Sequence, residues 1–208
     1  MNELTQTVYI VDDDEAVRDS LELLLDTVGL STHTYPSALA MLEDYELIHT
    51  RAQNACFILD IRMPGMSGTE LQQVLIDRGS DLPIIFITGH GDIPMAVKAI
   101  QRGAMDFIAK PFHDQDLLDR IQQALRLHSE RRDQVLEQQR TRDQIKTLTP
   151  REEQVLKCIL DGKANKIIAA ELCLSQRTVE VHRAHVMEKM SAPSLAHLIQ
   201  KISKLPPS

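Results

Sequence analysis

The chain has 208 residues, enough for one large domain or two of ordinary size. No apolar run approaches the ~20 residues of a membrane span, and the N-terminus lacks a signal-peptide core, so we expect a cytoplasmic protein without a membrane partner. Residues 1–126 hold 20 Asp and Glu against 9 Lys and Arg, whereas residues 147–208 hold 6 against 9. An acidic first part and a basic second part predict two domains with different partners, and nucleic acid is a candidate partner for the second.

Five short strand-like runs alternate with helical patterns through the first 126 residues. Strands are predicted at Val8–Val11, Ser31–Tyr35, Cys56–Leu59, Ile84–Thr88 and Met105–Ala109. Helices are predicted at Glu15–Val28, Ser37–Tyr45, Thr69–Asp77, Ile93–Arg102 and Asp114–Arg126, the third opened by a capping box from Ser67 to Glu70. This alternation predicts an α/β domain over residues 1–125, with a five-stranded, doubly wound parallel sheet of the flavodoxin-like kind.

A charged connector follows, assigned to residues 126–146. Residues 127–146 contain 9 charged side chains among 20 and no Gly or Pro, so a solvated continuation of the preceding helix is expected. A coiled coil is the alternative, although Val135, Leu136 and Ile145 are sparse for a heptad seam.

Residues 147–208 are predicted to form a small, all-helical domain. Thr149 and Glu152 give a capping box around Pro150 for a helix to Asp161, and a short helix follows at Asn165–Leu172. A tight connection leads to a helix that Ser175 caps and that reaches about Met190, and Pro193 opens a fourth. Three short helices with a tight turn before the third predict a helix-turn-helix, whose third helix enters the major groove of DNA.

The third of these helices carries most of the expected DNA contacts. Its inner face is predicted to hold Val179, His182, Val186 and Met190. Basic side chains would anchor phosphates, Glu180 could accept from a cytosine amino group, and an apolar side chain could touch a thymine methyl group. The candidate contacts are Lys166, Arg177, Thr178, Glu180, Val181, Arg183, Ala184 and Lys189. The alternatives are a merely solvated helix face and an adaptor that grips a protein.

The three cysteines and two neighbouring histidines have simpler explanations than a redox or metal-binding role. Cys56, Cys158 and Cys173 lie in apolar stretches without a CxxC spacing, so we expect buried free thiols in a reducing compartment, with a redox or metal role as the alternative. His182 and His185 are close enough in sequence to suggest metal ligands, but helix packing and surface exposure are the favoured interpretation.

Polar side chains follow four of the predicted strands. Asp12 and Asp13 come after the first strand and Asp60 after the third, while Thr88 and Lys110 end the fourth and fifth. Because the carboxyl ends of parallel strands meet at one edge, these groups are expected to lie together. Three carboxylates without a cation would repel one another. The combination suits a divalent cation and a phosphoryl group that a carboxylate accepts, although each residue alone would be an ordinary loop or surface residue.

The motifs around these residues resemble the receiver domain of bacterial two-component response regulators. They are Val11-Asp12-Asp13, Asp60-Ile61-Arg62-Met63-Pro64-Gly65, Thr88-Gly89-His90 and Lys110-Pro111-Phe112. The resemblance implies that Asp60 accepts a phosphoryl group from a sensor histidine kinase and that Lys110 contacts the acyl phosphate. It implies Mg²⁺, or Mn²⁺, held by Asp12, Asp13, Asp60 and the backbone carbonyl of Arg62.

The same resemblance implies a switch pair. Thr88 would move toward the phosphoryl group and Phe107 would turn inward behind it, although Phe107 is equally explained as a core ring. His90 is interpreted as a loop residue and not as a general base.

The C-terminal motifs resemble the LuxR-type helix-turn-helix. They are Leu148–Glu152, Asn165–Ala169, and Thr178–His182 with Lys189-Met190. Together the two halves resemble FixJ/NarL-type response regulators, which implies a transcription regulator that binds double-stranded promoter DNA, contacts RNA polymerase and forms a homodimer when phosphorylated. Enzyme activity would be limited to Mg²⁺-dependent self-phosphorylation and slow self-dephosphorylation. Control by unmasking the DNA-binding helix and control by dimerisation both stay open.

The main rival is a haloacid-dehalogenase-like phosphatase, which also uses an aspartate nucleophile and Mg²⁺. That chemistry needs a second Asp two residues after the nucleophile, and Asp60-Ile61-Arg62 lacks it. Asp12-Asp13-Asp14 has the spacing but would place the nucleophile on a different strand from Asp60. The response-regulator interpretation is therefore favoured.

Overall fold

A computed structural model describes residues 6–51, 54–89 and 93–206. The chain divides into two compact units, Met1–Arg131 and Arg132–Ser208, and the division falls inside the predicted connector. Within the described ranges no helix is both long enough and apolar enough to cross a bilayer.

The described part of the first unit contains a five-stranded parallel sheet, as predicted. The strand order is β2-β1-β3-β4-β5. Their bounds are Gln6–Val11 (β1), Ser31–Tyr35 (β2), Asn54–Asp60 (β3), Ile84–Thr88 (β4) and Asp106–Ala109 (β5). Every residue of β3 and β4 is buried, which explains their continuous apolar sequences, whereas β2 is polar because it forms an edge.

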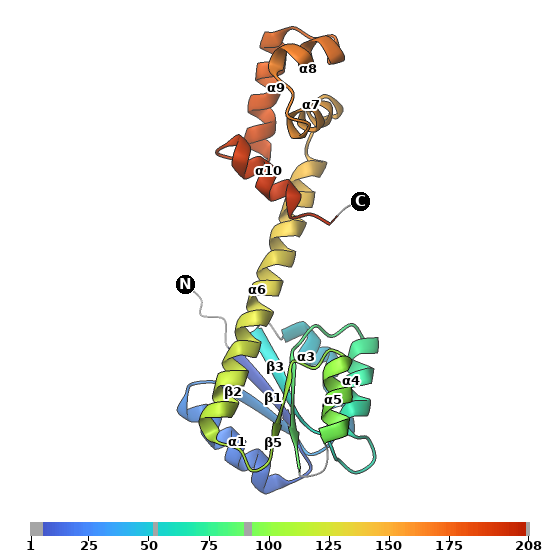
Figure 1. The fold of residues 1–208 in the computed structure, drawn as a ribbon, viewed down its shortest axis with the longest axis vertical. Coiled ribbons are helices and arrows are strands. Elements are labelled where there is room, and N and C mark those ends of the chain that lie inside the picture. The colour runs from blue at the N-terminus through green and yellow to red at the C-terminus, as the bar shows by residue number, and fades with distance from the viewer. Residues whose placement is uncertain (1–5, 52–53, 90–92, 207–208) are drawn as a thin grey trace. The chain divides into compact units, whose positions relative to one another are not determined.

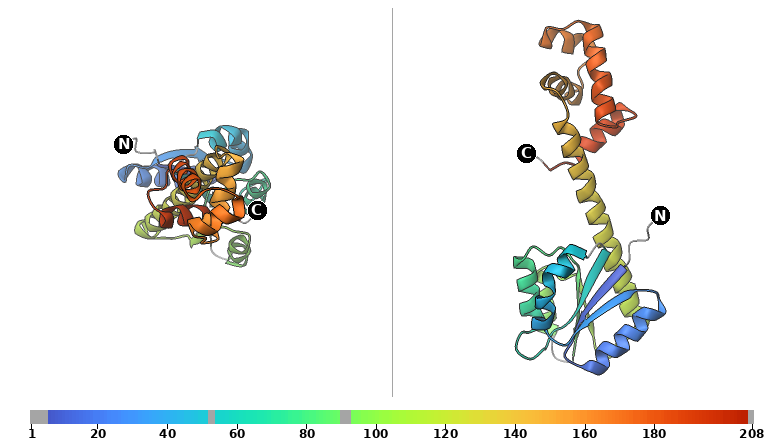
Figure 2. Two further views of the ribbon diagram at one scale, coloured as in Figure 1. Left: turned by 90° about the horizontal axis from the view of Figure 1, so that it is seen from above. Right: turned by 180° about the vertical axis from the view of Figure 1, so that it is seen from behind.

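Helices cover both faces of the sheet (Figures 1 and 2). On one face the apolar side chains of β1, β3 and β4 pack against α1 (Glu15–Thr27) and the first part of α6 (Asp114–Lys146). On the other face they pack against α2 (Ala38–Glu43), α3 (Tyr45–Arg51), α4 (Gly68–Asp77) and α5 (Ile93–Gln101). This two-sided arrangement leaves the carboxyl edge of the sheet open for the predicted site.

One helix of the first unit was not predicted. The sequence indicates a single helix over Ser37–Tyr45, but the structure ends α2 at Glu43, with Asp44 as its C-cap, and begins α3 at Tyr45. Tyr45 and Ile48 are each 3% exposed and join the core, so burial of these two side chains outweighs the polar composition around them.

The prediction that the connector continues the preceding helix is confirmed. The helix α6 runs from Asp114 to Lys146 without interruption. Its C-terminal end belongs to the second unit, where Gln138 donates to the carbonyl of Lys204 and Gln144 donates to Ser191.

The second unit adds four helices within the described residues. They are α7 (Pro150–Leu160), α8 (Asn165–Leu172), α9 (Gln176–Lys189) and α10 (Leu195–Ser203). The Thr149 to Glu152 capping box is present: the Thr149 hydroxyl accepts from the N–H of Glu152, and the Glu152 carboxylate accepts from the N–H of Thr149. Val155, Val179, Val186 and Met190 are fully buried in the core of this unit.

The prediction that all three cysteines are buried is wrong for Cys173. Cys56 and Cys158 are buried free thiols, but Cys173 is exposed. It occupies the left-handed C-cap of α8 with φ 53°, where the chain turns sharply toward α9 and the side chain faces solvent. Its neighbours are apolar because they fill the core on either side of this turn.

Candidate functional site

A lysine joins two aspartates at the carboxyl edge of the sheet. The Nζ of Lys110 lies 2.9 Å from Oδ2 of Asp12 and 3.0 Å from Oδ1 of Asp60. Lys110 follows β5, Asp12 follows β1 and Asp60 is the last residue of β3, and they are separated by up to 98 positions in the sequence. The parallel topology therefore brings together the two carboxylates and the ammonium group that the strand ends predicted.

Asp60 is held by the chain around it. Its Oδ2 accepts from the backbone N–H of Arg62 at 2.7 Å, and its side chain is 11% exposed. The Oδ1 atom faces Lys110, so a reactant approaching from solvent meets a carboxylate whose position is set from two sides.

Asp12 is a second buried carboxylate with its own supports. Its Oδ1 accepts from the N–H of Asp14 at 2.9 Å, and its backbone carbonyl accepts from Nη1 of Arg18 at 2.7 Å. The role of Arg18 was not predicted, because an arginine in the first turns of an exposed helix has no distinctive sequence signal. Asp13, the third predicted acid, directly follows Asp12 in the chain and is exposed.

The charged groups in the site change one another's pKa values. Burial raises the pKa of the Asp60 carboxyl, although the hydrogen bond and charge of Lys110 oppose that change. Burial alone would lower the pKa of Lys110, but its hydrogen bonds to Asp12 and Asp60 outweigh burial and raise it. Lys110 therefore stays positively charged, and it offsets the cost of keeping two carboxylates beside each other.

The donor set fits Mg²⁺, although it is not a closed cage. No three His, Cys, Asp or Glu side chains are gathered into a metal-binding group in the described parts of the chain. Mg²⁺ usually takes only one or two carboxylates and keeps waters and substrate oxygens for its other positions. Asp12 and Asp60 supply those carboxylates, and Asp13 and the backbone carbonyl of Arg62 lie next to them in the chain.

The predicted switch residues lie on neighbouring strands. Thr88 is fully buried, and its hydroxyl donates to the carbonyl of Gly89 at 3.2 Å. It pairs in register with Ala109, two residues beyond Phe107, so Thr88 and Phe107 project from the same face of the sheet. Phe107 is partly buried and packs against the core on that face.

A glycine at the start of α4 allows that helix to approach the acceptor strand. A Cβ on Gly68 would lie 2.1 Å from the carbonyl oxygen of Asp60, and the N–H of Gly68 donates to the carbonyl of Ile61. In the sequence, Gly68 belongs to a loop and to the capping box that opens α4, and neither pattern indicates this contact with β3.

Replacing Gly68 with alanine is therefore expected to move the backbone of Asp60. We expect Gly68→Ala to lower the free energy of unfolding by about 1–3 kcal/mol. Urea denaturation measures this change, with Thr69→Ala in the same helical turn as a control that adds no atoms. An unchanged urea midpoint for Gly68→Ala would show that the contact is relieved without cost.

The second unit presents one face of α9 to solvent. Ser175 caps this helix by accepting from the N–H of Thr178 at 3.1 Å. Val179, Val186 and Met190 face the core as predicted, whereas His182 is only partly buried. Arg177, Glu180, Val181 and Ala184 are exposed, Thr178 and Arg183 are partly exposed, and Lys166 is exposed on α8.

Lys189 is placed differently from the other candidate DNA contacts. Its Nζ lies 2.7 Å from Oε2 of Glu152 and donates to the carbonyl of Thr147. Glu152 is 4% exposed in its side chain, and Nδ1 of His185 lies 3.6 Å from its other oxygen. We therefore assign Lys189 to holding α9 against the start of α7.

His90 lies outside the described residues. His182 and His185 belong to no metal-binding group in the ranges that the structure describes. Instead, His185 faces Glu152, and the Nδ1 atom of His182 is buried in the helical unit.

Two protein families match the two units. The family described as "Response regulator receiver domain" matches residues 8–122. The family described as "Bacterial regulatory proteins, luxR family" matches residues 146–202.

Curated relatives match almost the whole chain. The "Response regulator protein TmoT" of Ectopseudomonas mendocina is 43% identical over 99% of this chain and 91% of its own length. The "Transcriptional regulatory protein FixJ" of Azorhizobium caulinodans is 42% identical over 93% of this chain and 90% of its own.

Two solved structures match almost the whole chain. A low-resolution structure of the response regulator StyR has a TM-score of 0.83 at 45% identity, covering 96% of this chain and 99% of its own. Full-length FixJ from B. japonicum has a TM-score of 0.61 at 39% identity, covering 95% and 96%. These families comprise transcription-regulating response regulators and not classical enzymes. The chain belongs to the FixJ/NarL-type response regulators, transcriptional regulators with a receiver domain and a LuxR-type DNA-binding domain.

Proposed function

We propose that this regulator is switched by phosphorylation of Asp60. The observation that carries the proposal is the bridge from Asp12 through Lys110 to Asp60 at the carboxyl edge of the sheet. This edge combines a carboxylate that can attack phosphorus with a fixed cation that can receive phosphoryl oxygens. A sensor histidine kinase is the proposed donor.

The reaction transfers a phosphoryl group between two side chains. An oxygen of the Asp60 carboxylate attacks the phosphorus of a kinase phosphohistidine, the P–N bond breaks, and its electron pair returns to the imidazole. Lys110 then exchanges its contact with Asp60 for a contact with a phosphoryl oxygen. The Thr88 hydroxyl turns from the Gly89 carbonyl to a second phosphoryl oxygen. Slow attack of water on the phosphorus later releases inorganic phosphate and restores the carboxylate.

Asp12, Asp13, Asp60 and the Arg62 carbonyl are the proposed ligands for Mg²⁺ or Mn²⁺. The bound ion supplies positive charge that neutralises the phosphoryl oxygens. Asp13 is exposed, so its carboxylate would be open to an ion that enters from solvent.

Phosphorylation is proposed to change the surface formed by α5 and β5. Thr88 and Phe107 lie on the same face of adjacent strands, so a movement of the first opens space for the second. Val97 and Ile100 of α5 are 45% and 37% exposed, which supplies apolar area for pairing of two receivers as a homodimer. Release of α9 from masking by the receiver is the second possible route.

The exposed face of α9 is the proposed contact with promoter DNA. Arg177 and Arg183, with Lys166 of α8, are the proposed phosphate contacts, and the exposed Glu180, Val181 and Ala184 are the proposed base contacts. Thr178 lies at the N-terminal end of the same helix. RNA polymerase is the further partner proposed for the DNA-bound regulator.

Two variants of α9 separate affinity from sequence preference. Arg177→Ala is expected to weaken binding to all sequences and to reduce the slope of log affinity against log salt by about one. Glu180→Ala is expected to change discrimination at one base pair by about 1–3 kcal/mol. Fluorescence anisotropy with promoter and random duplexes measures both. A parent protein without steep salt dependence would instead indicate a protein-binding adaptor.

The phosphorylation proposal is tested with beryllofluoride, a mimic of the phosphoryl group. With Mg²⁺ present, the mimic is expected to promote association, measured by light scattering, and to raise affinity for promoter DNA. With EDTA the mimic is expected to have no effect. If neither association nor DNA affinity responds to the mimic with Mg²⁺, the proposed switch is wrong.

A further inference from the structure

One buried histidine marks the last point at which α6 packs against the sheet. His128 is 2% exposed, and it follows the buried apolar residues Leu117, Ile121 and Leu125 on the same side of the helix. No residue from 129 to 140 is buried. The side chain that ends the apolar stripe is therefore a polar one that can titrate.

The imidazole of His128 contacts two other segments of the receiver unit. Its Nδ1 atom accepts from the backbone N–H of Ala55, at 3.3 Å, near the start of β3. Its Nε2 atom lies 3.8 Å from Oδ1 of Asp81, shortly before β4. The other end of β3 is Asp60, so one strand has the proposed phosphoacceptor at one end and the attachment of α6 at the other.

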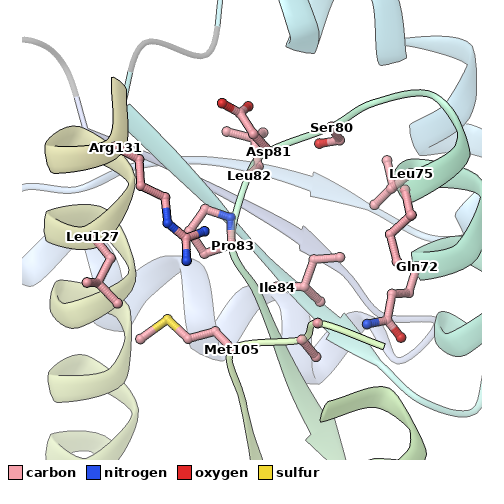
Figure 3. A pocket seen from close by; sticks show the side chains of 13 residues that line it. Gln72, Leu75, Ser80, Asp81, Leu82, Pro83, Ile84, Met105, Leu127 and Arg131 are labelled. Carbon is pink, nitrogen blue, oxygen red and sulfur yellow. The ribbon is translucent and has the colours of Figure 1, made fainter. Parts of the chain in front are cut away.

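Open space lies on both sides of this attachment. On one side, a recess of about 290 Å³ is lined by Leu127 and Arg131 of α6, and Figure 3 shows the Arg131 side chain extending toward Pro83. On the other side, a recess of about 430 Å³ is lined by Arg126 and Ser129 of α6 and by Asn54 of β3. Among residues 126–131 of α6 only His128 is buried, so the imidazole is the buried contact between this turn and the rest of the receiver unit.

The hydrogen bond requires a particular charge state of the ring. A nitrogen that accepts from an N–H cannot itself carry a proton, so Nδ1 must be unprotonated while the bond to Ala55 exists. Protonation would place two N–H groups against each other and would free the backbone N–H of Ala55. Attraction to Asp81 would at the same time favour the charged ring.

The groups around His128 leave its hydrogen bond to Ala55 dependent on the charge state of the ring. Among the described residues, Asp81 from the segment before β4 faces the ring, and the next turn of α6 carries Arg131 and Arg132. From β3 the neighbours are Ala55 and Asn54, which do not titrate. The side-chain oxygen of Asn54 is buried without a hydrogen-bond partner, so the base of β3 already carries one unsatisfied group.

We propose that His128 is a positioning residue whose neutral ring fixes where α6 leaves the receiver, and that protonation of the ring releases this segment of the helix. The proposal rests on the proposed function in one respect only: the proposed function gives α6 a role in transmitting the signal from the receiver to the DNA-binding unit. Acidification would therefore loosen the connection between the phosphoacceptor unit and the DNA-binding unit without touching Asp60.

Two replacements separate the hydrogen bond from the titration. In His128→Asn the side-chain carbonyl can take the place of Nδ1 and accept from Ala55, but the group does not titrate. In His128→Leu the ring is replaced by an apolar group, and the N–H of Ala55 loses its acceptor. The full-length chain is used in each case.

Hydrogen exchange in residues 126–140 and at Ala55, corrected for the intrinsic effect of pH, is the measurement. In the parent protein, protection is expected to fall about tenfold between pH 8 and pH 5.5, as the loss of one buried hydrogen bond would produce. His128→Asn should be protected at both values and His128→Leu at neither. Equal protection in the parent at both pH values, or the same pH response in His128→Asn, would overturn the proposal. Labelling of Asp60 from acetyl phosphate in the same samples tests the proposed function separately.

Discussion

Asp60→Asn is expected to abolish incorporation of a phosphoryl group from acetyl phosphate. The amide has almost the shape of the carboxylate and keeps an oxygen for the N–H of Arg62, but it is a poor nucleophile toward phosphorus. Because the amide is uncharged, Lys110 also loses one of the two carboxylates with which it forms ion pairs. Labelling with radioactive acetyl phosphate in Mg²⁺ should therefore fall to background.

Two controls make the Asp60→Asn experiment specific. Glu180→Ala changes only the exposed face of α9 and should be labelled as well as the parent. The urea midpoint of Asp60→Asn should show that the variant is folded. Label that persists in this folded variant would mean that another residue accepts the phosphoryl group.

Glu152→Gln is expected to destabilise the helical unit by about 1.5–3 kcal/mol, which is the range for hydrogen bonds to charged groups. Glu152 joins the N-terminus of α7 to Lys189 at the C-terminal end of α9, through contacts of 2.8 Å to the N–H of Thr149 and 2.7 Å to the lysine. Glutamine can keep the bond to Thr149 but cannot provide the charge that faces Lys189. Urea denaturation followed by circular dichroism measures the change.

The same residue predicts how stability depends on pH. The hydrogen bond to Lys189, followed by the bond from Thr149, lowers the pKa of Glu152 from 4.5 to about 2. A carboxyl with a lowered pKa in the folded state stabilises that state above the unfolded value and loses this contribution as it becomes protonated. The parent should therefore lose stability more steeply than Glu152→Gln between pH 4.5 and pH 2.

Glu153→Gln is the matched control, because Glu153 lies in the same helical turn but is exposed. This control should unfold at the parent midpoint near neutral pH and should keep the parent's response to acid. If Glu152→Gln behaves like Glu153→Gln, the ion pair with Lys189 contributes nothing measurable.

The sheet was predictable because its strands leave few alternatives. β3 and β4 are continuous apolar runs, and a run of that length buried on both faces belongs in the middle of a parallel sheet. The helices α1 and α4 were equally clear, since each has an apolar stripe and a cap. The carboxyl edge follows from the topology, which is why the sequence alone predicts that Asp12, Asp60 and Lys110 lie together.

Features that depend on tertiary contacts were not predictable in the same way. The helix α3 exists because Tyr45 and Ile48 find a buried site, and its sequence alone resembles a polar connection. Lys189 has the composition of a phosphate contact, but its ammonium group is directed by Glu152, which is 37 positions away in the sequence. Gly68 gave no signal of its contact with Asp60, because a capping box explains a glycine there without any reference to β3.

His128 lies between these two cases. A polar residue that continues the stripe of Leu117, Ile121 and Leu125 is visible in the sequence as a break in an apolar pattern. That break suggests a buried polar group, but it does not say which backbone N–H the ring accepts from. Only the fold brings His128 to the start of the strand that ends in Asp60.

The central claim is that an acyl phosphate on Asp60 controls DNA binding by the second unit. The most direct test is a titration of one promoter duplex with the phosphorylated protein, the unphosphorylated protein and Asp60→Asn at one salt concentration. If phosphorylation pairs two DNA-binding units on adjacent half-sites, the phosphorylated protein should bind about 10²- to 10⁴-fold more tightly than the other two. Equal affinity of all three, with full phosphorylation of the first verified by mass spectrometry, would contradict the account.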